Sequence, residues 1–233
     1  MLIRLEAVSK TYEIEQLKVQ ALREVNLGLD QAQIVVLIGA SGSGKTTLMN
    51  IASGLDLPTQ GRVFFQDELL SELSVNDRAK IRSKHMGFVF QLYNLLPTMS
   101  AVENVELPLI YQQVPFEERR AIAERLLGNV GLRDRVEHWP SELSGGEQQR
   151  VALSRALVMN PEVVFADEPT SNVDTRTGMD ILNLMVNMTR EKGTTFLIAT
   201  HDPKVLEVAT RVITVRDGIV KEEVSEEFKT TSY

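Results

Sequence analysis

The chain has 233 residues, of which 43% are apolar, and a net charge of −7 from 25 basic and 32 acidic side chains. This length suits one α/β domain, with or without an inserted subdomain, and the apolar share is sufficient for a packed core. The acidic balance argues against a nucleic-acid binder with a dominant basic face, and the absence of cysteine excludes disulfides, thiolate catalysis and cysteine-based metal sites.

The N-terminal residues Met1–Glu6 are interrupted by charges and lead into no apolar run, so we expect no signal peptide. No window of the sequence approaches the roughly 18 uninterrupted apolar residues of a membrane-spanning helix. If the protein works at a membrane, we expect it to do so through a partner.

The first part of the chain predicts strands around one glycine-rich turn. Alternation of apolar and polar residues predicts strands at 2–9 and 22–30, which we expect to be antiparallel. The apolar run 34–38 predicts a buried strand, and residues 47–52 have a helical pattern. Between these two lies Gly39-Ala40-Ser41-Gly42-Ser43-Gly44-Lys45-Thr46, which fits the P-loop pattern G-x-x-x-x-G-K-[ST].

The P-loop pattern predicts a polyphosphate site, because a strand, a glycine-rich turn and a helix follow one another in the required order. Glycines let successive backbone N–H groups surround phosphate oxygens, and the following helix adds the positive end of its dipole. We expect Lys45 to reach the β- and γ-phosphates and the Thr46 hydroxyl to hold Mg²⁺. The alternative, a glycine-rich turn without a ligand, leaves the Lys-Thr pair unexplained.

The middle of the chain predicts a change from strands to helices. Strands at 61–65 and 87–90 flank a short polar helix at 76–83. From Ser100 to about Asn160 only helical patterns occur, which predicts a helical insertion within an α/β domain. The remaining predicted elements are a strand at 163–166, a helix at 175–191, a strand at 194–199, a short helix at 203–209, a strand at 211–215 and a charged tail from 222.

The strand 163–166 ends in two carboxylates, Asp167 and Glu168. Ligands of open α/β sheets bind beyond the carboxyl ends of the strands, so we expect both acids near the phosphates. Neighbouring strand residues face opposite sides, so the two acids cannot share one task in ideal strand geometry. We assign Asp167 to the Mg²⁺ shell, and Glu168, where the strand gives way to a loop, to polarising a water near the γ-phosphate. Without the P-loop we would favour the alternative, a solvated acidic pair.

The segment Leu143–Arg150, with the sequence LSGGEQQR, predicts a second helix N-terminus that binds an anion. Ser144 and Glu147 have the spacing of a capping box, which is the purely structural explanation. That explanation does not account for Gly145 and Gly146, because glycine in the first turn costs helix stability. Close approach of the backbone to another group accounts for both glycines.

The P-loop, the segment LSGGEQQR and a strand ending in Asp-Glu together resemble the ATP-binding-cassette (ABC) ATPases. Within that resemblance, Gln91 matches the Q-loop glutamine that senses Mg²⁺ and the attacking water, and His201 matches the switch histidine that contacts the γ-phosphate. Tyr12 matches the aromatic residue that stacks on adenine. The structural alternatives are a histidine beside a helix start and an exposed loop tyrosine.

The resemblance covers residues 1 to about 222. Residues 171–174 (Ser-Asn-Val-Asp) resemble the D-loop, although the second and third positions depart from the more frequent Ala-Leu. The segments 87–97 and 101–109 are most similar to the branch that includes the MacB, LolD and FtsE ATPases.

The resemblance implies an α/β fold, with a P-loop NTPase (RecA-like) core, an N-terminal antiparallel β-subdomain and an inserted α-helical signature subdomain. All of it is expected in one ABC ATPase domain over 1–233. Residues 1–99 and 161–222 would form the core with the β-subdomain, 100–160 the helical subdomain and 223–233 a tail.

The implied activity is ATP hydrolysis with Mg²⁺, in a homodimer that sandwiches two ATP molecules and moves a membrane permease. The implied catalytic residues are Glu168, His201 and Gln91, and the implied metal ligands are Thr46, Gln91 and Asp167. The implied ATP-binding residues are Tyr12, Gly39, Ala40, Ser41, Gly42, Ser43, Gly44, Lys45, Thr46 and Thr47, joined by Ser144, Gly145, Gly146 and Glu147 of the second copy.

The resemblance also implies partners and a location. We expect a permease of the MacB/FtsX-like type, no nucleic acid, and a cytoplasmic protein held peripherally on the inner face of the cell membrane. A groove for the permease is expected along Leu92–Pro108, with Phe90, Leu92, Tyr93, Leu95, Leu96 and Met99 as lining residues, although ordinary packing is the alternative. An exporter or lipoprotein-release complex is the main hypothesis, and an FtsE-like regulatory ATPase that transmits force without moving cargo is the alternative. The net negative charge and the single motif set weigh against a cassette acting on DNA or ribosomes.

Overall fold

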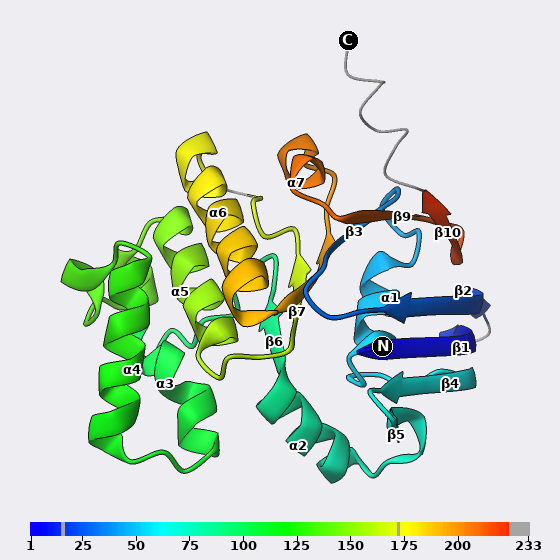
Figure 1. Ribbon diagram of the computed structural model, residues 1–233, viewed down its shortest axis with the longest axis horizontal. Coiled ribbons are helices and arrows are strands. Elements are labelled where there is room, and N and C mark those ends of the chain that lie inside the picture. The colour runs from blue at the N-terminus through cyan, green and yellow to red at the C-terminus, as the bar shows by residue number, and fades with distance from the viewer. Residues whose placement is uncertain (15–16, 172, 224–233) are drawn as a thin grey trace.

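A computed structural model describes residues 1–14, 17–171 and 173–223 of the protein. Asn172 of the predicted D-loop and nearly all of the predicted tail lie outside the described residues. The described ranges form two sheets with helices packed around them (Figure 1).

The larger sheet has six strands in the order β10-β9-β3-β8-β7-β6. All neighbours in it pair in parallel except β10, which runs antiparallel to β9 at one edge. The central strands are short and apolar because helices cover both faces of the sheet. The strands are β3 (Ile34–Ile38), β6 (Met86–Val89), β7 (Val163–Asp167), β8 (Thr195–Ala199), β9 (Arg211–Arg216) and β10 (Ile219–Glu223).

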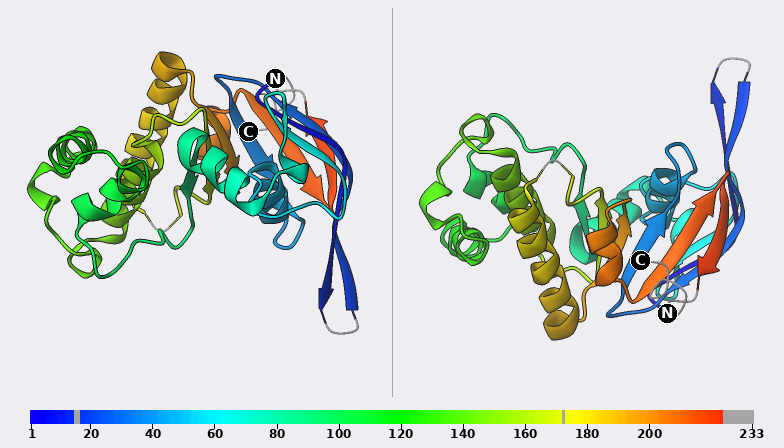
Figure 2. Two further views of the ribbon diagram at one scale, coloured as in Figure 1. Left: turned by 90° about the horizontal axis from the view of Figure 1, so that it is seen from below. Right: turned by 90° about the horizontal axis from the view of Figure 1, so that it is seen from above.

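The smaller sheet is antiparallel, in the order β2-β1-β4-β5. It consists of β1 (Ile3–Ile14), β2 (Leu17–Leu29), β4 (Gln60–Phe65) and β5 (Glu68–Leu69). The first two strands are longer than the predicted 2–9 and 22–30, so Tyr12 lies in a strand and not in a polar loop. The added length is a hairpin that extends away from the body of the molecule (Figure 2). Leu17 and Val19 alternate with Lys18 and Gln20, but all four residues are exposed, so this part of the strand has no buried face.

Helices cover the two faces of the larger sheet. The helix α1 (Lys45–Ala52) lies between the two sheets and buries Leu48 and Ile51 among side chains from both. The helices α6 (Thr175–Lys192) and α7 (Pro203–Glu207) pack on the opposite face. The helix α2 (Val75–His85) leads directly into β6.

The helices α3 (Ala101–Tyr111), α4 (Phe116–Asn129) and α5 (Gly145–Leu157) form a separate group on one side of the larger sheet (Figure 1). They share an apolar cluster that includes Val105, Leu127 and Val151. This cluster explains why only helical patterns occur from residue 100 to 160. Three short 3₁₀ turns lie at 70–72, 133–135 and 140–142.

Asn104 connects α3 to the loop that precedes it. Its side chain is fully buried, and its amide nitrogen donates to the carbonyl oxygens of Leu96 (3.1 Å), Met99 (3.0 Å) and Ser100 (3.0 Å). Its amide oxygen accepts a bond from the Leu96 backbone N–H at 2.8 Å. One side chain therefore contacts four backbone groups of a segment that has no regular structure, with its two amide hydrogens shared among three carbonyl oxygens.

We predict that Asn104→Ala lowers the free energy of unfolding by about 2 to 4 kcal/mol, because the Leu96 N–H and the Met99 carbonyl oxygen lose their side-chain partner. Urea denaturation measures the change. The matched control is Asn187→Ala at an exposed position on α6, where we expect a change within about 0.5 kcal/mol. Equal effects of the two substitutions would contradict this role of Asn104.

Candidate functional site

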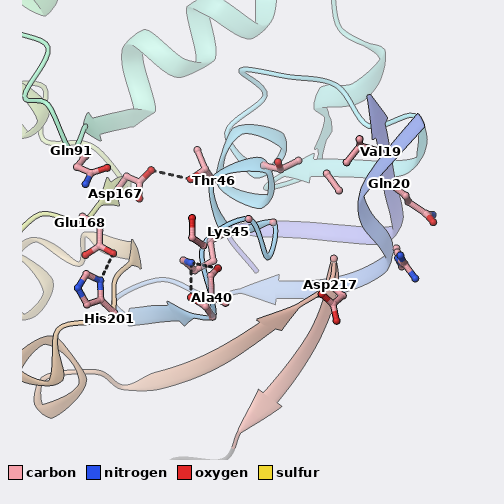
Figure 3. Close-up of a pocket in the computed structure, with 18 residues that line it drawn as sticks. Val19, Gln20, Ala40, Lys45, Thr46, Gln91, Asp167, Glu168, His201 and Asp217 are labelled. Carbon is pink, nitrogen blue, oxygen red and sulfur yellow. Dashed lines mark hydrogen bonds and ion pairs between the residues drawn. The ribbon is translucent and has the colours of Figure 1, made fainter. Parts of the chain in front are cut away.

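The carboxyl ends of the parallel strands open into a cavity of about 730 Å³ (Figure 3). The P-loop lies on one side of this cavity, and the ends of β6, β7 and β8 lie on the other. The lining residues are Val19, Gln20, Ala21, Arg23, Gly39, Ala40, Ser41, Gly42, Gly44, Lys45, Thr46, Thr47, Gln91, Asp167, Glu168, His201, Asp217 and Gly218.

The P-loop backbone has a shape that requires glycine at its ends. Gly44 has φ = 110°, and a Cβ atom there would lie 2.6 Å from the Ala21 carbonyl oxygen. A Cβ atom on Gly39 would lie 2.2 Å from the Val215 carbonyl oxygen. Gly44 is also the N-cap of α1, where no side chain caps the helix, so the first N–H groups of α1 are free to bind an anion. Ser43 differs from the rest of the loop, because its side chain is buried and does not line the cavity.

Lys45 and Thr46 both lie at the start of α1 and face the cavity. The Lys45 ammonium donates to the carbonyl oxygens of Gly39 (2.7 Å) and Ala40 (3.0 Å), so it is held above the loop. The Thr46 hydroxyl donates to an Asp167 carboxylate oxygen at 3.1 Å. Two oxygen ligands of the kind that Mg²⁺ prefers are thus side by side at the edge of the P-loop.

Asp167 and Glu168 face the same cavity although they are neighbours in the chain (Figure 3). Glu168 has a left-handed backbone with φ = 48°, which breaks the alternation of strand side chains. Burial raises the pKa of Asp167, the charge of Glu168 adds to the effect, and the bond from Thr46 opposes it. A carboxylate whose ionised form is disfavoured gains from a bound cation.

The Glu168 carboxylate is held by two side chains from the loop after β8. One oxygen lies 2.7 Å from Nδ1 of His201, and the other accepts a bond from the Thr200 hydroxyl at 2.9 Å. The Glu168 side chain is only 16% exposed, whereas that of His201 is 86% exposed. His201 is therefore able to move toward a ligand, whereas Glu168 is fixed.

Tyr12 lies near the cavity but is not among its lining residues. Its hydroxyl donates to Asp56 at 2.8 Å, and the Lys10 ammonium lies 4.8 Å from the centre of its ring. Burial and the neighbouring Asp56 raise the pKa of Tyr12, while a hydrogen bond with Thr47, a lining residue, lowers it. The predicted stacking residue is thus anchored at its hydroxyl beside the cavity.

A second wall of the cavity was not predicted from the sequence. Val19, Gln20, Ala21 and Arg23 of β2 line it, together with Asp217 and Gly218 of the turn between β9 and β10. The β2 residues reach the P-loop because the smaller sheet folds over it, and Asp217 and Gly218 reach it from the edge of the larger sheet. No short motif marks such a contact, and the close approach of Gly44 to Ala21 is visible only in three dimensions.

The residues Ser144, Gly145, Gly146 and Glu147 form the start of α5 and do not line the cavity of their own chain. The predicted capping box is present, with the Ser144 backbone N–H donating to Glu147 at 2.8 Å. That bond lowers the pKa of Glu147, and the nearby Arg135 and Arg150 contribute. A Cβ atom on Gly146 would lie 3.1 Å from the Thr177 methyl group, so packing against α6 is one reason for a glycine there.

No helix within the described ranges has the length and apolar character needed to cross a bilayer.

Comparison with known families gives a match over most of the chain. Residues 22–171 match the family model described as ABC transporter. An ABC transporter ATP-binding protein of Thermotoga maritima is 46% identical over 92% of this chain and 91% of its own length. The macrolide export ATP-binding/permease protein MacB of Syntrophobacter fumaroxidans is 45% identical over 95% of this chain, which spans only 31% of that relative.

Solved structures agree with these relatives. The ATP-binding cassette MJ0796, in a dimeric post-hydrolysis state bound to ADP and Pi, superposes with a TM-score of 0.92 at 40% identity. A second dimeric structure of that cassette gives a TM-score of 0.92 at 41% identity. Both cover 97% of this chain and 99% of the compared chain, which confirms the predicted P-loop NTPase fold of the cassette type.

We predict that Asp167→Asn raises the melting temperature of the nucleotide-free protein at pH 7.5 in EDTA. Because the pKa of Asp167 is higher in the folded protein than in the unfolded chain, folding is favoured when this carboxyl group is protonated. This stabilisation is complete below the ordinary aspartate pKa and is lost as the pH rises through the pKa of Asp167 in the folded protein. The advantage of the amide should therefore disappear in acid. Melting curves between pH 4 and 8 measure it, with Asp217→Asn at the exposed rim as the control. A lower melting temperature of Asp167→Asn at pH 7.5 would refute the prediction.

Proposed function

The chain belongs to the ABC transporter family of ATP-binding proteins, and we propose that it is the ATPase subunit of an exporter, coupling hydrolysis to movement of a membrane permease. The observation that carries the proposal is the cavity itself. The P-loop brings an uncapped helix N-terminus and Lys45 to one side of this cavity, and the end of β7 brings two carboxylates to the other.

Binding of ATP follows from the P-loop. The free N–H groups of α1 and the Lys45 ammonium would bind the phosphates, and Tyr12, anchored through Asp56, would offer its ring to the base. Thr46, Asp167 and Gln91 would hold Mg²⁺, which neutralises phosphate charge when bound. Their oxygen ligands fit such a cation, and Thr46 and Asp167 are already in contact.

Hydrolysis requires a base near the γ-phosphate. Glu168 is the candidate, because the left-handed backbone directs it into the cavity and Thr200 fixes its orientation. It would accept a proton from the attacking water, while His201 would leave Glu168 to donate to the phosphate.

A second copy of the chain completes the proposed site. The start of α5 lies outside the cavity of its own chain. Gly145 and Gly146 occupy the first turn of this helix, directly after the N-cap Ser144. The dimeric state of the structural relatives, one with ADP and Pi, supports a sandwich in which Ser144, Gly145, Gly146 and Glu147 close over the partner's ATP. ATP would bridge the two chains, and its hydrolysis would release them.

A groove of about 520 Å³ offers a place for the permease, between α2, α3 and the segment after β6. Phe90, Leu107 and Pro108 line it, together with Tyr111, which is 60% exposed. Of the other predicted lining residues, Leu92, Tyr93, Leu95, Leu96 and Met99 are not part of the groove, and Leu95 packs into the helical cluster. The name of the MacB relatives joins an ATP-binding part to a permease, which supports a MacB/FtsX-like partner and a location at the cytoplasmic face of the membrane.

Arg155 of α5 holds the segment that follows Gln91. Its guanidinium donates to the carbonyl oxygens of Tyr93 (2.7 Å) and Asn94 (2.6 Å), both of which have a left-handed backbone. Burial lowers the pKa of Arg155. The groove and α5 are thus connected by a charge-assisted contact.

We predict that Glu168→Gln lowers the rate of ATP hydrolysis at least about 100-fold and still binds ATP, because only the base is lost. Size-exclusion chromatography should then show a stable dimer with ATP and a monomer with ADP. The control is Glu191→Gln, at an exposed position on α6, which should behave as wild type. If Glu168→Gln binds ATP but stays monomeric, the sandwich is wrong.

We predict that Glu147→Gln weakens ATP-dependent dimerisation, whereas Glu103→Gln does not. Both residues complete capping boxes, in α5 and α3, and glutamine can take the same place, so each substitution should cost only about 0.3 to 1 kcal/mol, through loss of a negative charge at the helix N-terminus. Because the pKa of Glu147 is lowered in the folded protein, its ionised carboxylate stabilises the fold above the ordinary glutamate pKa. This stabilisation is lost as the pH falls through the pKa of Glu147 in the folded protein, so the cost of Glu147→Gln should vanish in acid.

Sedimentation of each variant in the Glu168→Gln background separates stability from dimerisation. Equal loss of dimer in the two variants would show that α5 acts only through its stability.

A further inference from the structure

Three phenylalanine rings form a continuous stack on one face of β6 and β7. The rings of Phe88 and Phe165 are 5.5 Å apart and inclined by 16°, and those of Phe88 and Phe90 are 6.1 Å apart and inclined by 10°. Phe165 is only 2% exposed, whereas Phe90 is 36% exposed. The stack therefore runs from the core to the surface.

The stack borders two different sites. Phe88 and Phe90 line the 520 Å³ groove. The same two rings and Phe165 also line a second cavity of about 250 Å³, which is bordered by Thr46 and Asp167. One set of rings thus separates the groove from the two oxygen ligands proposed for Mg²⁺.

Strand geometry explains why the inner ring lies next to the carboxylate. Phe165 and Asp167 are two residues apart on β7, so both side chains project from the same face of the sheet. Phe88 pairs directly with Phe165 across the two parallel strands. A sideways shift of the Phe88 ring would therefore act on Phe165, which lines the same cavity as Asp167.

We propose that the stack of Phe90, Phe88 and Phe165 transmits occupancy of the groove to Thr46 and Asp167, and so changes how strongly the site binds ATP together with Mg²⁺. Close-packed side chains move between discrete arrangements only where there is room, and the 250 Å³ cavity beside the rings provides that room. The three residues act as positioning residues. The inference rests on the proposed ATP site and deepens the proposed permease contact.

The chain has no cysteine, so a single introduced cysteine can be labelled without side reactions. Ser83→Cys and Ala79→Cys place a thiol on α2 at the wall of the groove, and N-phenylmaleimide then fills the groove with an aromatic ring. The control is Lys84→Cys, an exposed position on the same helix that does not line the groove. Isothermal titration gives the dissociation constant of ATP with Mg²⁺ and with EDTA for each protein before and after labelling.

We expect labelling at position 83 or 79 to change the ratio of the two dissociation constants about three- to tenfold, with the EDTA value nearly constant. Labelling at position 84 should leave the ratio unchanged. In a Phe88→Leu background the shift should disappear, whereas Phe65→Leu, a buried substitution in the same apolar cluster but outside the stack, should preserve it.

Two results would overturn the inference. The first is an unchanged ratio after labelling at both groove positions, with the Mg²⁺ dependence of the unlabelled protein intact, which would leave the proposed function standing. The second is a shift that persists in Phe88→Leu, which would show that another route carries it. A different failure, in which the unlabelled protein binds ATP equally with and without Mg²⁺, would instead contradict the proposed site itself.

Discussion

At the end of β7 the chain must present two carboxylates to one cavity, although neighbouring strand residues face opposite sides of a sheet. The left-handed backbone of Glu168 resolves this conflict, at the cost of a conformation that a non-glycine residue rarely adopts. The backbone N–H of Glu168 donates to the Ala199 carbonyl oxygen at 2.8 Å, and its carboxylate accepts a bond from Thr200, directly after β8. The strain is therefore supported by contacts with the neighbouring strand and the loop that follows it, and the proposed role of Glu168 as a base depends on it.

The helix starts around the proposed site differ in how they are capped. The starts of α3 and α5 are closed by capping boxes, whereas α1 has no side chain at its start. The uncapped N–H groups of α1 need an external partner, and the P-loop delivers them to the cavity. At α5 the box satisfies only part of the first turn, and Glu147 brings a negative charge that Arg135 balances at 3.5 Å.

The parts of the site that were predictable from the sequence are those made by short segments. The P-loop, Asp167, Glu168, Gln91 and His201 all follow strand ends, and parallel strands bring such ends together, so local patterns place all of them at one edge. The wall formed by Val19 and Arg23 was not predictable, because it depends on the smaller sheet folding over the loop. The outer part of the hairpin and the strands β5 and β10 were also not predicted, since the hairpin is exposed and the other two strands are short.

The helix α5 has consequences for two nucleotides at once. It has 13 residues and is therefore a rod about 20 Å long, with Ser144 at one end and Arg155 near the other. In the proposed dimer its first turn would sense the nucleotide of the second copy, while Arg155 grips the backbone that follows Gln91 beside the nucleotide of its own chain. The two proposed nucleotide sites would then be connected through one helix. A movement of the segment after Gln91 in one copy would shift α5 of that copy, and with it the contact of α5 with the nucleotide of the other copy.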